Sequence, residues 1–332
     1  MKLMLHAMVA GLALLVGAAQ AAEAESAAGF QFFQVEDPVS AKPMRAVLFY
    51  PAEAEAGHTK VGPVDVAAKE SVPVKAGRYP LVLLSHGNAG SPFSHHDTAT
   101  YLAQNGFVAA AVEHPGDNFR DTSGLGTDRV LIGRNLQLAA LLDALLERPE
   151  VSEYIDRSRI GVAGFSAGGY TALLMVGAKP KFELLKPYCA RQPGSVLCAG
   201  GGVVRLSSPP LHEKADPRIR AAFVMSPVGT LFDRPSLAAV DVPVYVFAAE
   251  NDEVLPPEEH ALKVVRELPV RPAYRQIPGA GHFVFLAPCS AAMKAAAAAI
   301  CSDPPQVDRA QVHAALNREM VTFFRTRLAA KP

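Results

Sequence analysis

The sequence predicts an α/β protein whose mostly parallel central sheet is flanked by helices. Short, continuous apolar runs recur along the chain, and runs of this length are typical of strands buried on both faces. Helical patterns lie between these runs, and such alternation favours a parallel sheet. The chain has 332 residues, of which 50% are hydrophobic, so it is long enough to form a large buried core.

The first 21 residues have the pattern of a signal peptide. Lys2 is followed by an apolar run over residues 3–16, and Ala19-Gln20-Ala21 resembles a cleavage site. A membrane anchor is the alternative, but the run is shorter than the roughly 20 residues that a span requires, and no later segment is long and apolar enough. We therefore expect cleavage near Ala21, a secreted or periplasmic protein, and one α/β domain over residues 22–332.

The expected strands follow in chain order. Residues 30–50 indicate two strands separated by a proline-containing turn, with the second at 44–50. Residues 51–77 are rich in Ala, Gly, Pro and charge, and indicate a long irregular connection. Further strands are expected at residues 81–84, 107–112, 160–163, 221–225, 242–248 and 273–277.

Helices are expected at residues 98–104, 131–146, 167–176, 258–268 and 307–327. One segment, residues 179–217, interrupts this rhythm. It contains several prolines, two cysteines and three consecutive glycines, and it is too long for an ordinary connection. It predicts either a lid that borders the site and sets substrate size or an ordered surface excursion.

The strongest chemical signal is Gly164-Phe165-Ser166-Ala167-Gly168, which follows an expected strand and opens an expected helix. A G-x-S-x-G motif in this context places its serine on a sharp turn, and the flanking glycines prevent side-chain collisions. We interpret Ser166 as a nucleophile, whereas a tightly packed helix start is the structural alternative.

A second signal, Ser85-His86-Gly87-Asn88, follows the strand at residues 81–84. A loop in this position commonly supplies half of an oxyanion hole. We expect one donor to be the backbone N–H of Asn88 and the other to be that of Ala167, directly after the nucleophile. His86 is interpreted as a residue that shapes the loop.

An acid and a base are expected after the last two strands. Asp252 lies in the loop after residues 242–248 and is the favoured acid, with Glu250 as the alternative. His282 lies in the glycine-rich loop after residues 273–277. The order Ser166, Asp252, His282 is that of one known type of catalytic triad, in which the histidine takes the serine proton and the aspartate orients the histidine.

Two other polar clusters suggest structural roles. Ser94-His95-His96-Asp97 superficially resembles a metal site, but adjacent residues on a helix point in different directions and do not converge on one ion. We expect Ser94 to cap the helix instead. Residues 113–117 (Glu-His-Pro-Gly-Asp) follow a strand and are interpreted as a structural turn near the site, with contact to substrate as the alternative. No metal or cofactor is expected.

Four cysteines form two local groups, each separated by about ten residues. Four cysteines permit three connectivities, and loop closure favours the local pairs Cys189–Cys198 and Cys289–Cys301. An exported protein would oxidise them. Lys plus Arg equals Asp plus Glu, at 32 each, so the balanced charge gives no reason to expect nucleic acid or an anionic membrane as a partner.

Taken in order, these motifs resemble the predicted dienelactone hydrolase group, which is similar to the platelet-activating-factor acetylhydrolases. The resemblance runs from about residue 44 to 286 and rests on residues 81–87, 101–108, 114–116, the Ser166 motif and 281–283. It implies the α/β-hydrolase fold and hydrolysis of carboxylic esters. Dienelactone hydrolases use cysteine where this chain has Ser166. The combination of an expected signal peptide with two expected disulfides also resembles cutinase-like polyesterases. These enzymes often hold substrate with a Trp side chain, which this chain lacks.

The leading hypothesis is a serine esterase that forms an acyl-enzyme on small or medium esters or lactones. Phe93, Phe165 and Phe283 flank the expected catalytic positions and favour an apolar substrate group. The alternatives are polyesterase or lipase-like activity, amidase activity, and a non-catalytic binding protein that retains the fold. The expected partner is a small-molecule ester.

Overall fold

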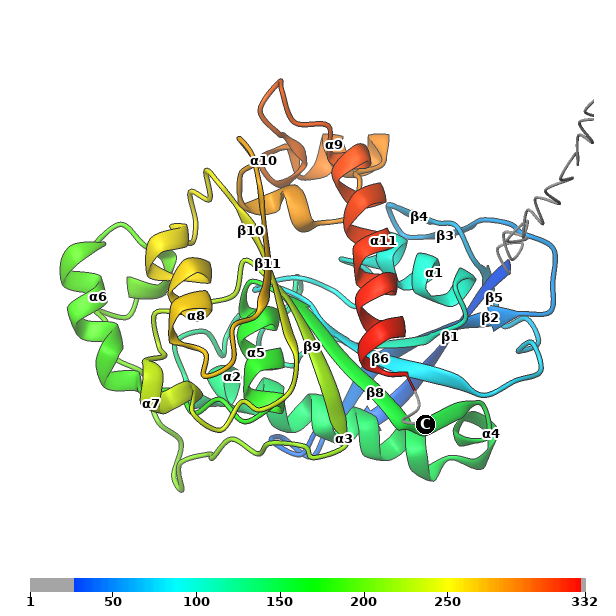
Figure 1. Ribbon diagram of the computed structural model, residues 1–332, viewed down its shortest axis with the longest axis horizontal. Coiled ribbons are helices and arrows are strands. Elements are labelled where there is room, and N and C mark those ends of the chain that lie inside the picture. Colours follow the sequence, from blue (N-terminus) through cyan, green and yellow to red (C-terminus); the bar gives the residue numbers. More distant parts are fainter. Residues whose placement is uncertain (1–26, 330–332) are drawn as a thin grey trace, which may run out of the picture.

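The computed structural model describes residues 27–329 (Figure 1), so the expected signal peptide, residues 1–21 with cleavage near Ala21, lies outside the described residues. The described chain contains a nine-stranded sheet in the order β11-β10-β9-β8-β6-β7-β2-β1-β5. β6 to β11 are parallel to one another, whereas β2 and β1 add in antiparallel fashion at one side. The predicted mostly parallel sheet is confirmed. Its strands are β1 (Ala27–Glu36), β2 (Pro43–Ala52), β5 (Lys69–Glu70), β6 (Tyr79–Ser85), β7 (Val108–Val112), β8 (Ile155–Phe165), β9 (Ile219–Met225), β10 (Val244–Ala249) and β11 (Ala273–Ile277).

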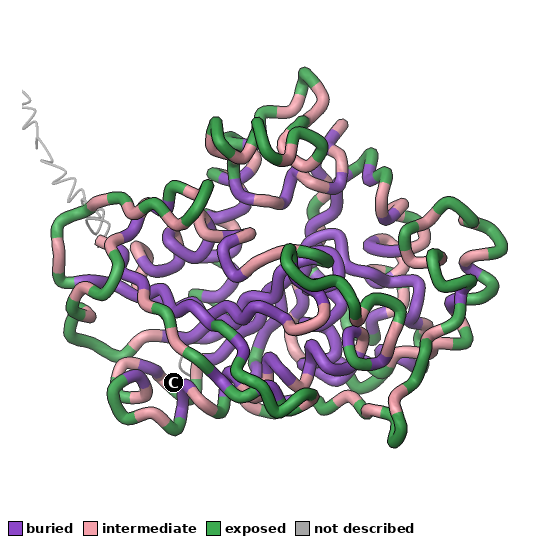
Figure 2. The backbone as a smooth tube through the Cα atoms, turned by 180° about the vertical axis from the view of Figure 1, so that it is seen from behind, coloured by how far each residue is buried: buried purple, intermediate pink, exposed green. Residues whose placement is uncertain are grey.

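Helices cover both faces of this sheet, because successive strand side chains point to opposite faces. Leu81 and Leu83 of β6 pack with the helices α3 (Gly133–Glu147), α5 (Ala167–Met175) and α8 (Ala261–Glu267). Val82 and Leu84 pack on the other face with α1 (His96–Gln104) and α11 (Arg309–Arg327). Figure 2 shows the strands as the buried centre of the molecule.

The irregular connection predicted for residues 51–77 is wrong in part. It contains a hairpin of β3 (Thr59–Val61) and β4 (Val64–Val66), joined through Gly62 at a φ of +57°. It also contains β5, which pairs with β1. These strands have only two or three residues, which is too short for an apolar run that would predict them from the sequence.

Local capping explains why several helices begin at residues other than those expected from the sequence. Ser94 is not the cap of α1: the helix begins at His96, and the Ser94 hydroxyl accepts the N–H of Ser91 at 2.9 Å. Asp308 caps α11 by accepting the N–H groups of Ala310 and Gln311, so this helix begins at Arg309. The remaining helices of the main domain are short: α2 (Asp128–Leu131), α4 (Pro149–Ser152), α7 (Arg234–Leu237) and two 3₁₀ turns, one before α8 (Pro257–Glu259) and one after β11 (His282–Phe285).

Residues 179–217 form an ordered excursion beside the sheet. It contains a 3₁₀ turn (Phe182–Leu184), α6 (Leu185–Arg191) and a second 3₁₀ turn (Val196–Cys198). Its far end is held to the end of α5 by the Asp216 N–H, which donates to the carbonyl of Met175 at 2.9 Å. We call this segment the first wall.

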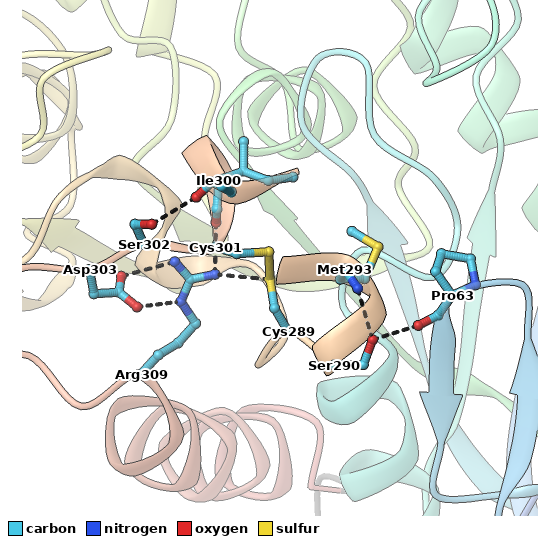
Figure 3. Close-up of a disulfide and its surroundings, with 10 residues drawn as sticks. Pro63, Cys289, Ser290, Met293, Ile300, Cys301, Ser302, Asp303 and Arg309 are labelled. Atoms are coloured by element: carbon cyan, nitrogen blue, oxygen red, sulfur yellow. Dashed lines mark hydrogen bonds and ion pairs between the residues drawn. A yellow bond between two sulfur atoms is a disulfide. The ribbon is translucent and has the colours of Figure 1, made fainter. Parts of the chain in front are cut away.

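A second excursion, residues 287–306, was not expected from the sequence, and we call it the second wall. It carries α9 (Ala291–Ala296) and α10 (Ala298–Cys301). Figure 3 shows how it is tied down. Arg309 of α11 donates to both carboxylate oxygens of Asp303, at 2.8 and 2.9 Å, and to the carbonyl of Ile300 at 2.9 Å. Ser290 donates to the carbonyl of Pro63 in the β3–β4 hairpin at 2.6 Å.

Each wall contains one disulfide, and both predicted pairs are present. Cys189 bonds Cys198 in the first wall, and Cys289 bonds Cys301 in the second. Among residues 27–329, no helix has both the length and the apolar character that crossing a bilayer requires.

Non-reducing peptide mapping should recover these two disulfides from the purified protein. Replacing Cys289 and Cys301 together by serine should lower the free energy of unfolding by about 3 kcal/mol, because the closed loop restricts the unfolded chain. Urea unfolding without reductant measures the loss. Free thiols at all four positions, or cross-linked pairs between the walls, would contradict the assignment.

Candidate active site

Ser166 occupies a strained turn between the end of β8 and the start of α5. Its φ is +56° and its ψ is −118°, a conformation that residues with a side chain rarely adopt. Its N–H donates to the carbonyl of Met225 on β9 at 2.9 Å, which anchors the turn to the sheet. Such a turn raises the serine hydroxyl above the carboxyl edge of the sheet.

The two flanking glycines permit this turn by allowing backbone segments to touch. A Cβ on Gly164 would lie 2.1 Å from the carbonyl oxygen of Gly168. A Cβ on Gly168 would lie 1.9 Å from the carbonyl oxygen of Ser85 on β6. Both positions therefore exclude any side chain, as the sequence motif suggests.

The structure brings together the three residues that the sequence proposed as a triad. His282 Nε2 lies 3.1 Å from Ser166 Oγ, and His282 Nδ1 lies 2.8 Å from Asp252 Oδ2. All three side chains are buried. This arrangement lets the imidazole accept the serine proton while the carboxylate fixes the ring.

The Asp252 carboxylate is fixed by its own loop. Its Oδ1 accepts the N–H groups of Val254 at 3.1 Å and Leu255 at 2.7 Å, which leaves Oδ2 for His282. Glu250, the alternative acid, instead accepts the N–H of Gly279 at 2.7 Å. The carboxylate beside the imidazole is therefore that of Asp252, and Glu250 braces the histidine loop.

The predicted oxyanion loop lies directly against the serine. A Cβ on Gly87 would lie 3.4 Å from Ser166 Cβ. No hydrogen bond within residues 27–329 occupies the N–H of Asn88. Ala167 is the first residue of α5, where an N–H has no partner within its own helix. Both N–H groups are free to bind an oxyanion, and their role remains a prediction.

His86 supports this loop from within. Its Nδ1–H donates to the carbonyl of Gly87 at 2.7 Å, and its Nε2 accepts the N–H of His114 at 3.3 Å. This pattern requires a neutral ring. Burial and the nearby Arg134 guanidinium hold the pKa of His86 well below its usual range, which agrees with that requirement.

Residues 113–117, which the sequence placed near the site, are mainly structural. His114 is fully buried, with Nε2 3.0 Å from Ser85 Oγ and Nδ1 2.8 Å from Gln137 Oε1. Asp117 is also buried and forms an ion pair with Arg134 of α3. Asp117 belongs to the turn expected from the sequence, whereas its partner Arg134 was not expected near the site. The feature of the sequence that could have indicated a buried polar network is the group Arg134, Asn135 and Gln137 near the start of α3, all three of which are buried.

The cluster at residues 94–97 contributes to structure through Asp97. Its Oδ2 accepts His313 Nδ1–H at 2.6 Å, and His313 Nε2 lies 2.9 Å from the carbonyl of Val284, two residues after His282. Burial alone would lower the pKa of His313, but Asp97 raises it. The described residues contain no group of side chains arranged to hold a metal ion.

A cleft of about 1310 Å³ leads to Ser166, and its lining is mainly apolar. The first wall contributes Leu185, Val196, Leu197 and Val203, and the second wall contributes Met293 and Ile300. The predicted substrate residues Phe93, Phe165 and Phe283 also line it. The Phe165 and Phe283 rings contact the His282 ring, with centroids 4.7 and 5.3 Å away. The first wall therefore borders the candidate site.

Apolar side chains continue outward from the cleft. Five of the seven large hydrophobic residues that are exposed in the described chain lie on two loops: Phe119, Leu125, Val196, Val203 and Leu206. A β-bridge between Thr127 and Arg205 joins these loops. The first four residues also line the cleft, so they form an apolar rim at its mouth.

Comparisons with known proteins agree with this architecture. The family model for platelet-activating factor acetylhydrolase, isoform II, matches residues 52–130, which include β6, the oxyanion loop and α1. Comparison with curated proteins gives no significant match. Among 1012 matching chains of solved structures, one is the ferulic acid esterase from Streptomyces cinnamoneus, with a TM-score of 0.64 and 19% identity over 94% of this chain and 93% of that chain. The likeness confirms the α/β-hydrolase fold.

Replacing Gly168 by alanine should destabilise the protein by about 3 kcal/mol or more and remove any activity of Ser166, because backbone atoms rather than flexible side chains occupy the space. Urea unfolding checks the stability. Gly194 is a matched control, since a Cβ there meets nothing within 4 Å. A Gly168→Ala protein as stable as Gly194→Ala would show that the turn tolerates a side chain.

Proposed function

We propose that this protein is a secreted serine hydrolase that cleaves carboxylic esters, with Ser166 as the nucleophile. The chain of hydrogen bonds from Ser166 through His282 to Asp252 is the observation on which the proposal rests. The strained backbone at Ser166 adds support, because stored strain of this kind is concentrated at functional sites. The similarity to a platelet-activating factor acetylhydrolase family and to a ferulic acid esterase also supports ester hydrolysis.

The geometry suggests a two-step reaction. Ser166 Oγ attacks the ester carbonyl carbon while His282 Nε2 accepts the hydroxyl proton, and Asp252 stabilises the resulting imidazolium. The N–H groups of Asn88 and Ala167 bind the oxyanion. The C–O bond to the alcohol then breaks, and His282 returns the proton to the leaving alcohol. Water, activated by the same histidine, hydrolyses the acyl-enzyme and regenerates Ser166.

The proposed substrates are small to medium esters or lactones that contain an apolar group. The cleft offers mainly apolar surface on both sides of Ser166, and pockets of this kind recognise substrates largely by burying their hydrocarbon parts. We also propose that residues 179–217 set the size of the group that binds, since six of their apolar side chains line the cleft.

The exposed apolar rim favours a second candidate, a polyesterase or lipase-like enzyme. Large apolar patches on a soluble surface commonly mark binding sites, and this rim is continuous with the cleft. An amidase would use the same catalytic residues. A non-catalytic binding protein would have no use for a strained serine hydrogen-bonded to a histidine.

We propose export on separate grounds. Residues 1–21 have the pattern of a signal peptide, and the two disulfides suit an oxidising compartment.

Replacing Ser166 by alanine should reduce hydrolysis of p-nitrophenyl esters by several orders of magnitude, about 10⁶-fold in comparable triads, while leaving the fold intact. Ser158 is a matched control, because it lies at the opposite end of β8. A fluorophosphonate probe should label the native protein and the Ser158→Ala variant but not Ser166→Ala. Substantial residual activity in Ser166→Ala would exclude Ser166 as the nucleophile.

Replacing Val196 and Val203 together by serine should raise KM for long-chain p-nitrophenyl esters by up to about tenfold, with little effect on the acetate, because each valine would lose buried apolar contact with the chain. Val270→Ser is the control: Val270 is 60% exposed, like Val196 at 63% and Val203 at 61%, but it does not line the cleft. A chain-length profile identical in both variants would exclude this rim from substrate binding.

A further inference from the structure

The most unusual buried group outside the triad is the guanidinium of Arg134, on α3 beneath the oxyanion loop. The residue is 1% exposed. Its Nη1 donates to Asp117 Oδ2 at 2.6 Å. Its Nη2 donates to the carbonyl of His86 and, at 3.2 Å, to Ser85 Oγ. The Nη2 group of Arg134 is therefore directed at the segment that carries the oxyanion loop, and its Nη1 group is directed at Asp117.

The Arg134–Asp117 pair holds this loop on both sides of Asn88. Arg134 binds the carbonyl of His86, two residues before Asn88. The second carboxylate oxygen of Asp117, Oδ1, accepts the N–H of Ala89 at 2.8 Å. Ala89 has a φ of +52°, which is unfavourable for alanine. The bond from Asp117 therefore holds a backbone shape that the sequence alone disfavours.

The same guanidinium also reaches the nucleophile helix. Arg134 Nε donates to Thr171 Oγ1 at 3.3 Å, and the Thr171 hydroxyl donates to the carbonyl of Ala167 at 2.9 Å. The Arg134 side chain thus connects the loop that carries Asn88, through the carbonyl of His86, with Ala167, through Thr171.

Stability alone does not account for such a pair. Removing two charges from water costs several kcal/mol per ion, and apolar residues of similar volume often stabilise a protein as well or better. Neither Arg134 nor Asp117 lines the cleft, so substrate does not touch them. Their contacts all end on backbone or hydroxyl groups that shape the site.

We propose that Arg134 and Asp117 form a positioning unit that sets the distance between the two oxyanion donors, Asn88 N–H and Ala167 N–H. The proposal rests on the proposed function and goes beyond it, because it assigns a role in the reaction to residues remote from the substrate. An oxyanion hole acts only when the carbonyl oxygen gains charge. Loss of its geometry therefore lowers kcat, whereas ground-state binding in the apolar cleft is retained.

The test compares Arg134→Met and Asp117→Asn with a remote control. Each variant is expected to lower kcat by about 10²-fold, the order that loss of one oxyanion donor costs, with KM changed less than about threefold. Labelling of Ser166 by a fluorophosphonate should slow in parallel, because its phosphoryl oxygen requires the same donors. Arg218→Met is the control, since Arg218 pairs with Asp216 and Asp143 at the opposite edge of the sheet; its kcat should equal that of the native protein.

Thr171→Val tests the link to α5 with little change in volume, and it should lower kcat by about tenfold without unfolding the protein. If Arg134→Met does not fold, Asp117→Asn and Thr171→Val decide the question. A folded Asp117→Asn variant with native kcat, or one in which only KM rises, would overturn the proposal.

Hydrogen exchange separates this proposal from the proposed function. In Asp117→Asn, amides of residues 86–91 should exchange faster than in Arg218→Met, while those of β8 stay protected. If the native protein neither hydrolyses esters nor reacts with the probe, the proposed function fails, and the assigned role in catalysis fails with it. Unchanged exchange at residues 86–91 would overturn the positioning role alone.

Discussion

The backbone of Ser166 is the constraint on which the rest of the site depends. Its positive φ is possible because three backbone segments meet there without side chains between them: the end of β6, the end of β8 and the first turn of α5. The hydrogen bond from its N–H to Met225 adds β9 to this junction. Close packing of four segments supplies what a strained turn needs to persist. The same contact brings the predicted oxyanion loop beside the serine, so the positions of the proposed nucleophile and of the proposed oxyanion donors are determined together.

The parallel sheet explains how residues far apart in sequence meet at this junction. Parallel strands all end at the same edge, and β6, β8, β10 and β11 each deliver one part of the site from the loop that follows them. Those loops supply Asn88, Ser166, Asp252 and His282. The aspartate and histidine loops are also joined to each other, because Glu253 accepts the N–H of His282 at 3.0 Å and Glu250 that of Gly279. The imidazole is thus held through its backbone as well as its ring.

What could be predicted from the sequence was local. Continuous apolar runs identified the central strands, the glycines around Ser166 identified the turn, and short cysteine spacings identified the disulfides. The hairpin at residues 59–66 was not predicted because its strands are too short to show alternation of apolar and polar residues. The helices of the second wall were not predicted because their apolar residues do not repeat at helical spacing. The Arg134–Asp117 pair escaped for a different reason: Arg134 is buried by strand ends and loops far from it in sequence, and a basic residue at the start of a helix ordinarily lies in solvent.

The construction of the two cleft walls affects which sequence changes the fold can tolerate. Each wall is a continuous stretch of chain inserted between two elements of the main domain, and each is closed by a disulfide within itself. Insertions or deletions inside a wall therefore leave the register of every strand in the sheet unchanged. The proposed catalytic residues lie on loops that follow the strands of the sheet, whereas much of the cleft lining lies on the two walls. Variation within the walls can therefore change the lining of the cleft while the geometry around Ser166 is retained.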